Sequence, residues 1–281
     1  MNIQLIQIPY DSGHESLRTG RGPDFFIQSG LEQALKDSSH QVASRRLVSQ
    51  LNFIADIETT FELNGVLAQE VQQAITNEKF PFVLAGACHC SVGVLGGIGH
   101  ESTGMIWFDG HGDFNTPETT LSGLLDGMGL AMATGRCWKA MLNGIPGFAP
   151  TPDEHVIHIG GRDFDLEEET LLRGSGIRLV EPSFTSAVMR QSLEAALTGL
   201  SERMKRVYIH KDLDVLDMGD ALANHADSPG GISLEFALEA IGMIKNKFEV
   251  CAGAIGSFDP DYDKDDKVLN AGFEIIKAIV A

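Results

Sequence analysis

WFDGHGDFN, at residues 107–115, is the stretch that decides the fold. An apolar run that ends at Phe108 is typical of a buried strand, and Asp109, His111 and Asp113 follow it at alternate positions. In an extended backbone, alternate side chains point the same way and repeat roughly every 6.6 Å along one face. These three side chains can therefore converge on one small volume, as metal ligands do.

Two further strand-like runs end in side chains of the same kind. Residues 206–210 lead into Asp212 and Asp214, and residues 80–85 lead into His89. A lone Asp-x-His-x-Asp motif favours a solvated loop. Three clusters, each after an apolar strand, favour a metal site instead. Four carboxylates and two imidazoles are too many for one ion but suit two, with carboxylates bridging ions about 3.5–4 Å apart.

Composition narrows the class of protein. A chain of 281 residues fits a single α/β domain over residues 1–281 with a sizeable core. Its 39 acidic and 21 basic side chains give a net charge of −18, which should repel nucleic acid and anionic membranes. We find neither a signal-peptide pattern at the N-terminus nor a run of about 18 apolar residues, so we expect a cytoplasmic protein.

The cysteines lack the spacing of a disulfide framework, so we expect reduced thiols at Cys88, Cys90, Cys137 and Cys251. Cys88 and Cys90 flank His89. With no second cysteine pair in the chain, we do not assign them to a soft-metal site.

About eight strand-like runs alternate with helix-like segments. The expected strands are 1–8, 41–48, 80–85, 105–108, 155–160, 177–180, 206–210 and 249–256. The expected helices are 23–37, 61–78, 91–98, 126–134, 165–172, 183–204, 233–245 and 268–280. This alternation predicts a three-layer, doubly wound, mostly parallel sheet with helices on both faces. In such sheets, ligands bind beyond the carboxyl ends of the strands, which is where all three clusters fall.

Taken together, the clusters resemble the arginase-type ureohydrolase family (arginase, agmatinase and formiminoglutamase), and the arginase branch most closely. The likeness runs from the Gly20-Arg21-Gly22-Pro23 loop to the last strand. It implies an arginase-like fold, a homo-oligomer (trimer or hexamer) and two divalent metal ions. Mn²⁺ is favoured, and Ni²⁺, Co²⁺ or Fe²⁺ would also be compatible with the ligands. By resemblance, one metal is bound by His89 and Asp113, the other by His111 and Asp214, with Asp109 and Asp212 bridging.

The resemblance extends to the substrate. Residues 115–123, NTPETTLSG, are similar to the arginase segment that holds the substrate's α-carboxylate, with Asn115, Thr120 and Ser122 as the contacts. Residues 162–165, RDFD, are similar to the segment whose second aspartate, here Asp165, faces the α-amino group; Glu168 fits the same region. The implied partner is a small, amino-acid-like substrate.

Two positions depart from the arginase pattern. Asp126 stands where arginases have a histidine that shuttles protons or orients the substrate. The ordinary pKa of an aspartate is about 3.9, whereas that of a histidine is about 6.5, so an ordinary aspartate shuttles protons poorly at neutral pH. Ser257 replaces the glutamate that pairs with the guanidinium, and a serine makes no bidentate, charge-assisted bond. Losing such a partner costs about 2–5 kcal/mol, or roughly 30- to 4000-fold. Arginine hydrolysis in the standard pose is therefore not expected, unless Asp126 itself faces the cation.

The predicted chemistry is metal-assisted hydrolysis of a C–N bond in a guanidino- or amidino-type amino acid. Asp113, which in the family touches the attacking oxygen, would pass a proton to the leaving nitrogen, and Asp126 is the second candidate catalytic residue. Two alternatives stay open: a standard guanidino-hydrolase with a rearranged clamp, and a metal-holding binding or regulatory protein that has lost turnover.

We expect the remaining histidines and the acidic run 259–266 to have structural rather than ligand roles. The histidines without ligand spacing are His14, His40, His100, His155, His158 and His225, of which His14 and His225 lie in loops that could border the cavity. His210, by alternation, should point with the bridging acids and support them. The acidic run 259–266 lacks the glycine and terminal glutamate of a calcium-binding loop, so we expect it to be solvated.

Overall fold

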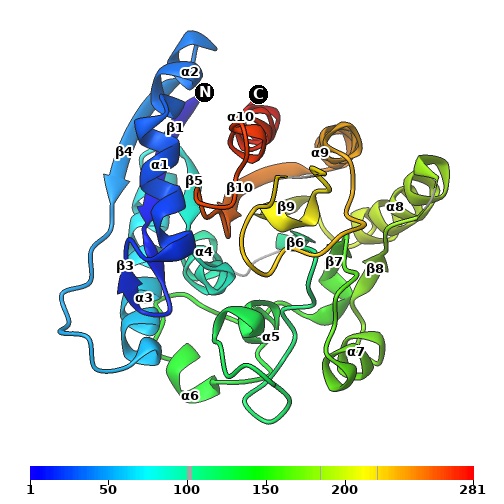
Figure 1. The fold of residues 1–281 in the computed structure, drawn as a ribbon, viewed down its shortest axis with the longest axis horizontal. Helices are drawn as coiled ribbons and strands as arrows, with labels where there is room; N and C mark the ends of the chain where they lie inside the picture. Colours follow the sequence, from blue (N-terminus) through cyan, green and yellow to red (C-terminus); the bar gives the residue numbers. More distant parts are fainter. Residues whose placement is uncertain (100–102, 184, 220) are drawn as a thin grey trace.

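The computed structural model describes residues 1–99, 103–183, 185–219 and 221–281. An eight-stranded sheet crosses the molecule in the order β4-β1-β5-β10-β9-β6-β7-β8 (Figure 1), and all its strand pairs are parallel. Its strands are β1 (Asn2–Ile8), β4 (Gln41–Arg46), β5 (Phe80–Ala85), β6 (Thr103–Phe108), β7 (Val156–Ile159), β8 (Arg178–Val180), β9 (Arg206–Asp212) and β10 (Glu249–Gly256). A separate antiparallel hairpin, β2 (Tyr10–Asp11) with β3 (His14–Glu15), lies between β1 and α1, where the sequence predicts neither a strand nor a helix.

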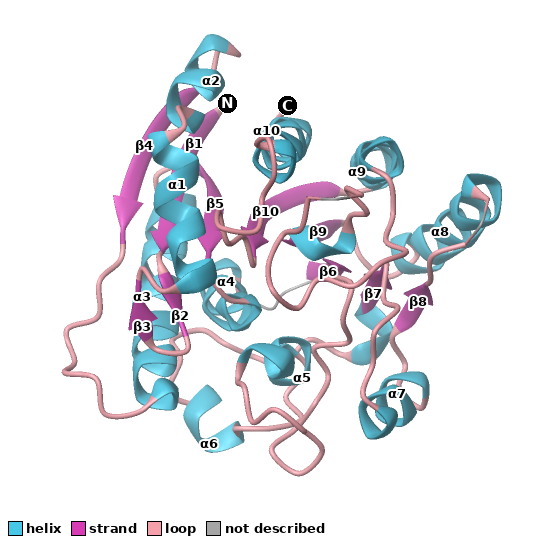
Figure 2. Ribbon diagram, in the orientation of Figure 1, coloured by secondary structure: helices cyan, strands magenta, loops and turns pink. Residues whose placement is uncertain are grey.

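Helices cover both faces of the sheet (Figure 2), which confirms the predicted three-layer α/β class. One face packs against α1 (Gly22–Gln28), α2 (Leu31–Asp37), α8 (Ser186–Ser201), α9 (Leu234–Lys247) and α10 (Lys267–Val280). The other packs against α3 (Asp56–Thr76), α4 (Ser91–Ile98) and α5 (Gly129–Ala133), with α6 (Lys139–Leu142) and α7 (Leu166–Arg173) alongside. No helix among the described residues is long and apolar enough to cross a membrane.

Strand alternation divides the core into two layers. In β6, Ile106 and Phe108 join the apolar cluster under α8, α9 and α10, whereas Met105 and Trp107 join the cluster under α3, α4 and α5. All four side chains are fully buried. A strand buried on both faces must be apolar at every position, and this is why the central strands are continuous apolar runs in the sequence.

The helices differ from prediction in several places. The short helix α6 was not predicted, and the segment 126–134 forms a 3-10 turn (Asp126–Met128) followed by α5. The segment 23–37 forms two helices because Gly30 between them adopts a left-handed backbone, with φ of 93°. The helix predicted at 61–78 begins earlier, at Asp56. The predicted start of α9 is confirmed: Ser233 caps the helix, and its hydroxyl accepts the backbone N–H of Phe236 at 3.1 Å.

The acidic run 259–266 is not simply solvated, so that prediction is wrong for two of its members. Asp259 is buried and accepts a hydrogen bond from Arg21 at 2.5 Å. Asp263 accepts the backbone N–H groups of Val268 and Leu269, both at 2.9 Å, at the start of α10. Asp259 thus joins the loop after β10 to Arg21, and Asp263 supplies the acceptors that the N-terminus of α10 needs.

Candidate metal centre and substrate cavity

Five neighbouring strands of the sheet, β5, β10, β9, β6 and β7, lead into the candidate site residues. A short 3-10 helix (Cys88–Cys90) follows β5, and another (Leu213–Val215) follows β9. Because the strands are parallel and adjacent, their carboxyl ends open onto the same edge. The structure thus brings together side chains that are up to 168 positions apart, from His89 to Ser257.

Ligand atoms of the predicted metal-binding residues converge in two groups. In one, the ligand atoms of Asp109, His111 and Asp214 all lie within 4.8 Å of one another. His111 Nδ1 is 3.2 Å from Asp214 Oδ2 and 3.6 Å from Asp109 Oδ1. The second group consists of Cys88, Asp109 and Asp113, again within 4.8 Å. Asp109 belongs to both groups, as a bridging ligand would.

His89 and Asp212 surround these groups without belonging to them among the residues that the structure describes. His89 Nδ1 is buried without a hydrogen-bond partner, and its Nε2 lies 3.5 Å from Thr60 Oγ1. Asp113 Oδ2 is also buried and unpartnered. Unpaired buried polar atoms are costly and rare in folded proteins. Cations between these atoms would satisfy them, so the donor set fits a pair of divalent ions.

Electrostatics supports the same fit. Burial raises the pKa of Asp113 well above its ordinary value, and Asp109, Asp126 and Asp212 raise it further. Burial also raises the pKa of Asp212 strongly. For Asp214, burial works in the same direction, but the neighbouring His111 imidazolium and hydrogen bonds bring its pKa down to about 2. Crowded carboxylates of this kind need positive charge among them to be ionised together.

Asp109 is oriented by hydrogen bonds, one of which comes from Trp107 in the apolar layer under α3, α4 and α5. Trp107 Nε1 donates to Asp109 Oδ2 at 3.0 Å, and the backbone N–H of His111 donates to Oδ1 at 2.7 Å. The Trp107 ring stacks on His210 with centroids 3.8 Å apart, and Tyr208 Oη lies 2.9 Å from His210 Nδ1. Within the part of the chain that the structure describes, His210 contacts Trp107 and Tyr208, and Trp107 in turn bonds Asp109. His210 therefore supports the acids less directly than predicted.

Glu168 fastens the loop after β6 to α7. Its Oε1 accepts the backbone N–H of Phe114 at 2.8 Å, and its Oε2 accepts the N–H of Asp165 at 3.1 Å. Asp165 in turn caps α7, forming a reciprocal capping box with Glu168. Gly112 lies against this carboxylate: a Cβ there would meet Glu168 Cδ at 2.7 Å. The absence of a side chain at 112 lets the loop after β6 lie close to α7.

A cavity of about 410 Å³ opens above the two groups. Asp113, Asp212 and Asp214 line it, together with four of the five predicted substrate-binding residues: Asn115, Ser122, Asp165 and Ser257. Asn115 Nδ2 donates to Asp165 Oδ2 at 3.0 Å. Thr120, the fifth, does not line the cavity itself, but its Oγ1 lies 3.4 Å from Oγ of Ser122, which does.

The two departures from the arginase pattern lie in this cavity. Asp126 lines it and accepts the backbone N–H of Cys88 at 2.6 Å. Burial, with added repulsion from Asp11 and other acids, raises the pKa of Asp126 to about 7, so it is not the ordinary acid considered from the sequence. Ser257 is buried, with its Oγ 3.4 Å from Cys88 Sγ and a left-handed backbone φ of 58°.

Sequence reasoning missed several residues here. Asn224, from the loop after β9, donates to Asp214 Oδ2 at 3.3 Å and to the Ser257 carbonyl at 2.8 Å. Arg18 lines the cavity and is held by Asp11, with Nε 2.7 Å from Oδ2. Asn224 and Arg18 lie in no motif that would mark them in the sequence. Cys88, which belongs to one of the ligand groups, was marked in the sequence only by its position next to His89.

The weak histidine candidates separate. His225 lines the cavity. His14 packs instead on Phe53, with ring centroids 4.0 Å apart. His158 is buried, and its Nε2 lies 2.8 Å from the carbonyl oxygen of His111, so it is satisfied locally. His100 lies outside the described residues.

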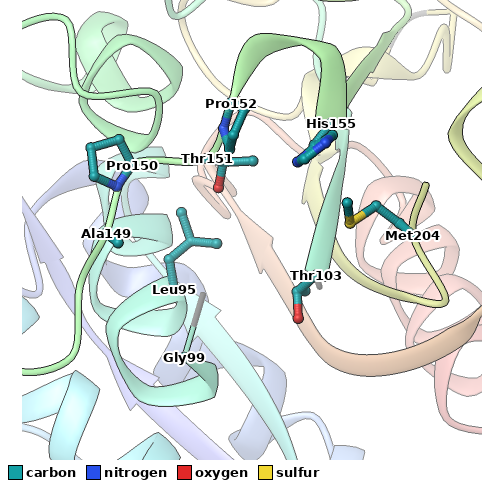
Figure 3. Close-up of a pocket in the computed structure, with 9 residues that line it drawn as sticks. All are labelled: Leu95, Gly99, Thr103, Ala149, Pro150, Thr151, Pro152, His155 and Met204. Carbon is teal, nitrogen blue, oxygen red and sulfur yellow. The ribbon is translucent and has the colours of Figure 1, made fainter. Parts of the chain in front are cut away.

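A second cavity, of about 230 Å³, lies at the amino ends of β6, β7 and β9 (Figure 3). Its lining combines Leu95, Gly99, Thr103, Ala149, Pro150, Thr151, Pro152, His155 and Met204. Among the described residues that line it, His155 is the one ionisable side chain, and there is no carboxylate. This cavity therefore lacks the ligands that distinguish the first.

The structure is thus a parallel α/β protein with clustered carboxylates and imidazoles at the carboxyl edge of its sheet, groups that could hold metal ions. The model of the arginase family matches residues 1–281. The chain belongs to the arginase family, as the resemblance predicted.

Relatives of known structure agree. Arginase of Bacillus subtilis is 28% identical over 99% of this chain and 97% of that protein. A crystal structure of the B. subtilis arginase superposes with a TM-score of 0.88 at 27% identity, covering 100% of this chain and 99% of the other. The native structure of arginase from Bacillus caldovelox gives a TM-score of 0.86 at 26% identity, covering 99% and 97%.

Proposed function

We propose that this protein is a binuclear-metal hydrolase that cleaves a C–N bond of a guanidino- or amidino-type amino acid, with a substrate clamp different from that expected for an arginase. The observation that carries the proposal is that Asp109 belongs to two groups of ligand atoms, each within 4.8 Å of one another. Other members of these groups, His111, Asp113 and Asp214, line a cavity of about 410 Å³. Membership of the arginase family supports the reaction class.

The metals would be held by the residues named from the sequence: His89, Asp109, His111, Asp113, Asp212 and Asp214. When bound, two divalent cations supply an activated water near neutral pH and stabilise developing negative charge. Mn²⁺ suits oxygen and imidazole ligands, and Ni²⁺, Co²⁺ or Fe²⁺ are compatible. The buried, unpartnered atoms of His89 and Asp113 are what the ions would satisfy.

The polypeptide's own part is to hold the substrate and move protons. Asp113, whose Oδ2 is buried without a partner, would transfer a proton to the leaving nitrogen. Asn115, Ser122 and Asp165 line one region of the cavity and offer an amide, a hydroxyl and a carboxylate to an amino-acid headgroup. Thr120 would act through Ser122, whose hydroxyl is 3.4 Å away.

The reacting end of the substrate is where this chain should differ from an arginase. Ser257 gives a hydroxyl, so a neutral or weakly basic group is favoured over a guanidinium at that point. Asp126 is the alternative partner for a cation, because its carboxylate lines the same cavity and belongs to neither ligand group.

The substrate class is tested by measuring the products of C–N cleavage from metal-loaded protein given four substrates. These products are urea from L-arginine or agmatine, hydroxyurea from Nω-hydroxyarginine, and formamide from formiminoglutamate. We expect turnover of an amidino or formimino substrate, or of an arginine analogue, that exceeds turnover of L-arginine. L-arginine as the best substrate by a wide margin would contradict the proposed change of clamp. No turnover of any of the four, in protein shown to contain two metals, would contradict the hydrolase proposal for this substrate class.

The role of Asp126 needs a separate binding experiment. Asp126→Asn should weaken binding of a guanidino ligand, because it removes the cavity's candidate counter-charge. Asp163→Asn is the matched control: Asp163 also lines the cavity but follows β7, beyond β6 from Ser257. Equal affinities of the wild-type protein and Asp126→Asn would exclude Asp126 as the clamp.

A homo-oligomer, a trimer or a hexamer, stays a proposal that rests on the family resemblance. Light scattering of the purified protein tests it directly.

A further inference from the structure

We infer that Cys88 is a ligand of the metal ion that Asp109 and Asp113 bind, and that its thiolate shifts the centre's preference from Mn²⁺ toward softer ions such as Co²⁺, Fe²⁺ or Zn²⁺. The inference rests on the proposed binuclear centre and goes beyond it, because the ligand set expected by resemblance contains only carboxylates and imidazoles.

The position of the sulfur carries the inference. Cys88 follows β5, and its side chain is 1% exposed. Its Sγ lies within 4.8 Å of ligand oxygens of both Asp109 and Asp113. It also donates to Asp212 Oδ2 at 3.0 Å. The thiol is therefore surrounded by three carboxylates that come from β6 and β9.

These distances suit ligands of a common ion. Metal–sulfur and metal–oxygen bonds to Zn²⁺ are about 2.3 Å and 2.0–2.2 Å, so two such ligands lie at most about 4.5 Å apart. The atoms of this group lie within 4.8 Å of one another, so tetrahedral binding of a common ion would draw them together by at most about 1.2 Å. The thiol proton now lies between sulfur and the Asp212 carboxylate, and a cation binding the same lone pairs would replace it, releasing that proton to solvent.

A second observation points to a ligand at the same place. Asp113 Oδ2 is buried and has no hydrogen-bond partner. Among the described residues, the group that contains Asp113 is completed by Cys88 and not by His89, whose Nε2 lies 3.5 Å from Thr60. The sulfur thus adds a donor next to Asp113, beside His89, whose Nδ1 is buried and has no partner.

Cys90 provides an internal contrast. It is two residues away and equally buried, at 2% exposure, yet the structure gives its thiol no hydrogen bond within the described part of the chain. It also belongs to neither ligand group among those residues. The two cysteines that looked equivalent in the sequence therefore have different surroundings, and Cys90 is a matched control.

The consequence is a change of metal preference. A thiolate is a soft ligand that favours Zn²⁺, Co²⁺ and Fe²⁺, whereas Mn²⁺ binds oxygen ligands and lies lowest in the divalent affinity series. A centre of carboxylates and imidazoles would tolerate Mn²⁺. A centre with one thiolate would bind Co²⁺ relatively better.

The test is to load the full-length apoprotein with Co²⁺, count the bound metal by mass spectrometry and record the ultraviolet–visible spectrum. A sulfur-to-cobalt charge-transfer band in the near ultraviolet is expected in the wild-type protein and in Cys90→Ser, and is expected to be absent in Cys88→Ser and Cys88→Ala. Competition between Co²⁺ and Mn²⁺ should show a preference for Co²⁺ that falls by at least about tenfold in Cys88→Ser.

The outcomes separate the two levels of the argument. A wild-type protein that binds Co²⁺ without this band, or a band that persists in Cys88→Ser, overturns the assignment of Cys88 even if two ions are bound. One ion per chain, with a band that Cys88→Ser abolishes, supports Cys88 and contradicts the binuclear centre. Failure to bind Co²⁺ at all contradicts both. The wild-type spectrum alone can refute the assignment of Cys88, so the test remains valid even if a variant folds poorly.

Discussion

Trp107→Phe tests whether the apolar layer under the site orients the metal ligands. The substitution keeps an aromatic ring over His210 and removes one donor, the indole N–H that bonds Asp109 Oδ2 at 3.0 Å. Trp107 is fully buried, so water cannot readily replace this donor. A hydrogen bond to a charged group contributes about 1.5–3 kcal/mol, which corresponds to roughly 10- to 150-fold in affinity.

Loss of this bond should weaken binding of metal at both groups, because Asp109 belongs to each. The expected loss is about 10- to 100-fold, the usual effect of removing a partner that orients a metal ligand. The measurement is competitive metal titration against a chromogenic chelator, with thermal unfolding of the apoprotein recorded in parallel. The smaller ring should also lower stability, by less than the roughly 3–5 kcal/mol typical of removing a whole aromatic side chain.

Tyr208→Phe is the matched control. It removes a hydroxyl that lies 2.9 Å from His210 Nδ1 in the same buried layer, without touching Asp109. Metal affinity should be unchanged in this variant while apoprotein stability falls. If Trp107→Phe binds metal as tightly as the wild-type protein, or if both variants lose affinity equally, the reasoning about Asp109 is refuted.

Three further predictions follow from the same geometry. Gly112→Ala should lower the melting temperature by a few degrees, because the new Cβ would meet Glu168 Cδ at 2.7 Å and overpacking costs about 1–3 kcal/mol. Gly199→Ala is the control, because a Cβ at that position would enter open space. Equal melting temperatures of the two variants would contradict the packing argument. Chelation should destabilise the protein, and metal restored at about 100 times its Kd should add about 2.7 kcal/mol, whereas unfolding insensitive to metal would exclude a built-in site. Ser257→Glu should raise kcat/KM for L-arginine by about tenfold or more, since a charge-assisted bond is worth about 1.5–3 kcal/mol, and Ser257→Gln should not; equal gains would exclude a charge effect.

Much of the fold could be predicted because burial on two faces leaves a simple signal. The central strands are uninterrupted apolar runs, and β5, β10 and α4 have the predicted bounds. The break at Gly30 could not be predicted, since an isolated glycine inside a helical pattern is usually tolerated. Only its left-handed backbone, with φ of 93°, shows that the chain turns there.

The site was partly predictable for a similar reason. Spacing by two after a strand places Asp109 and His111 on one side, and parallel strands bring Asp214 to the same edge. The environment of each group could not be predicted. The pKa of Asp126, raised to about 7, depends on burial by segments distant in the sequence. Cys88 turns into the carboxylates because a 3-10 helix begins there, which interrupts strand alternation.

The central claim is that hydrolysis in this cavity depends on metal ions shared through Asp109. The most direct measurement is release of the cleavage product from the best substrate of the four. The protein is assayed metal-loaded, chelated and then reloaded, and Asp109→Asn is treated in the same way. The account predicts activity in the loaded protein, its loss on chelation, its return on reloading, and none at any stage in Asp109→Asn. Undiminished turnover by protein with no detectable metal, or by Asp109→Asn, would contradict it.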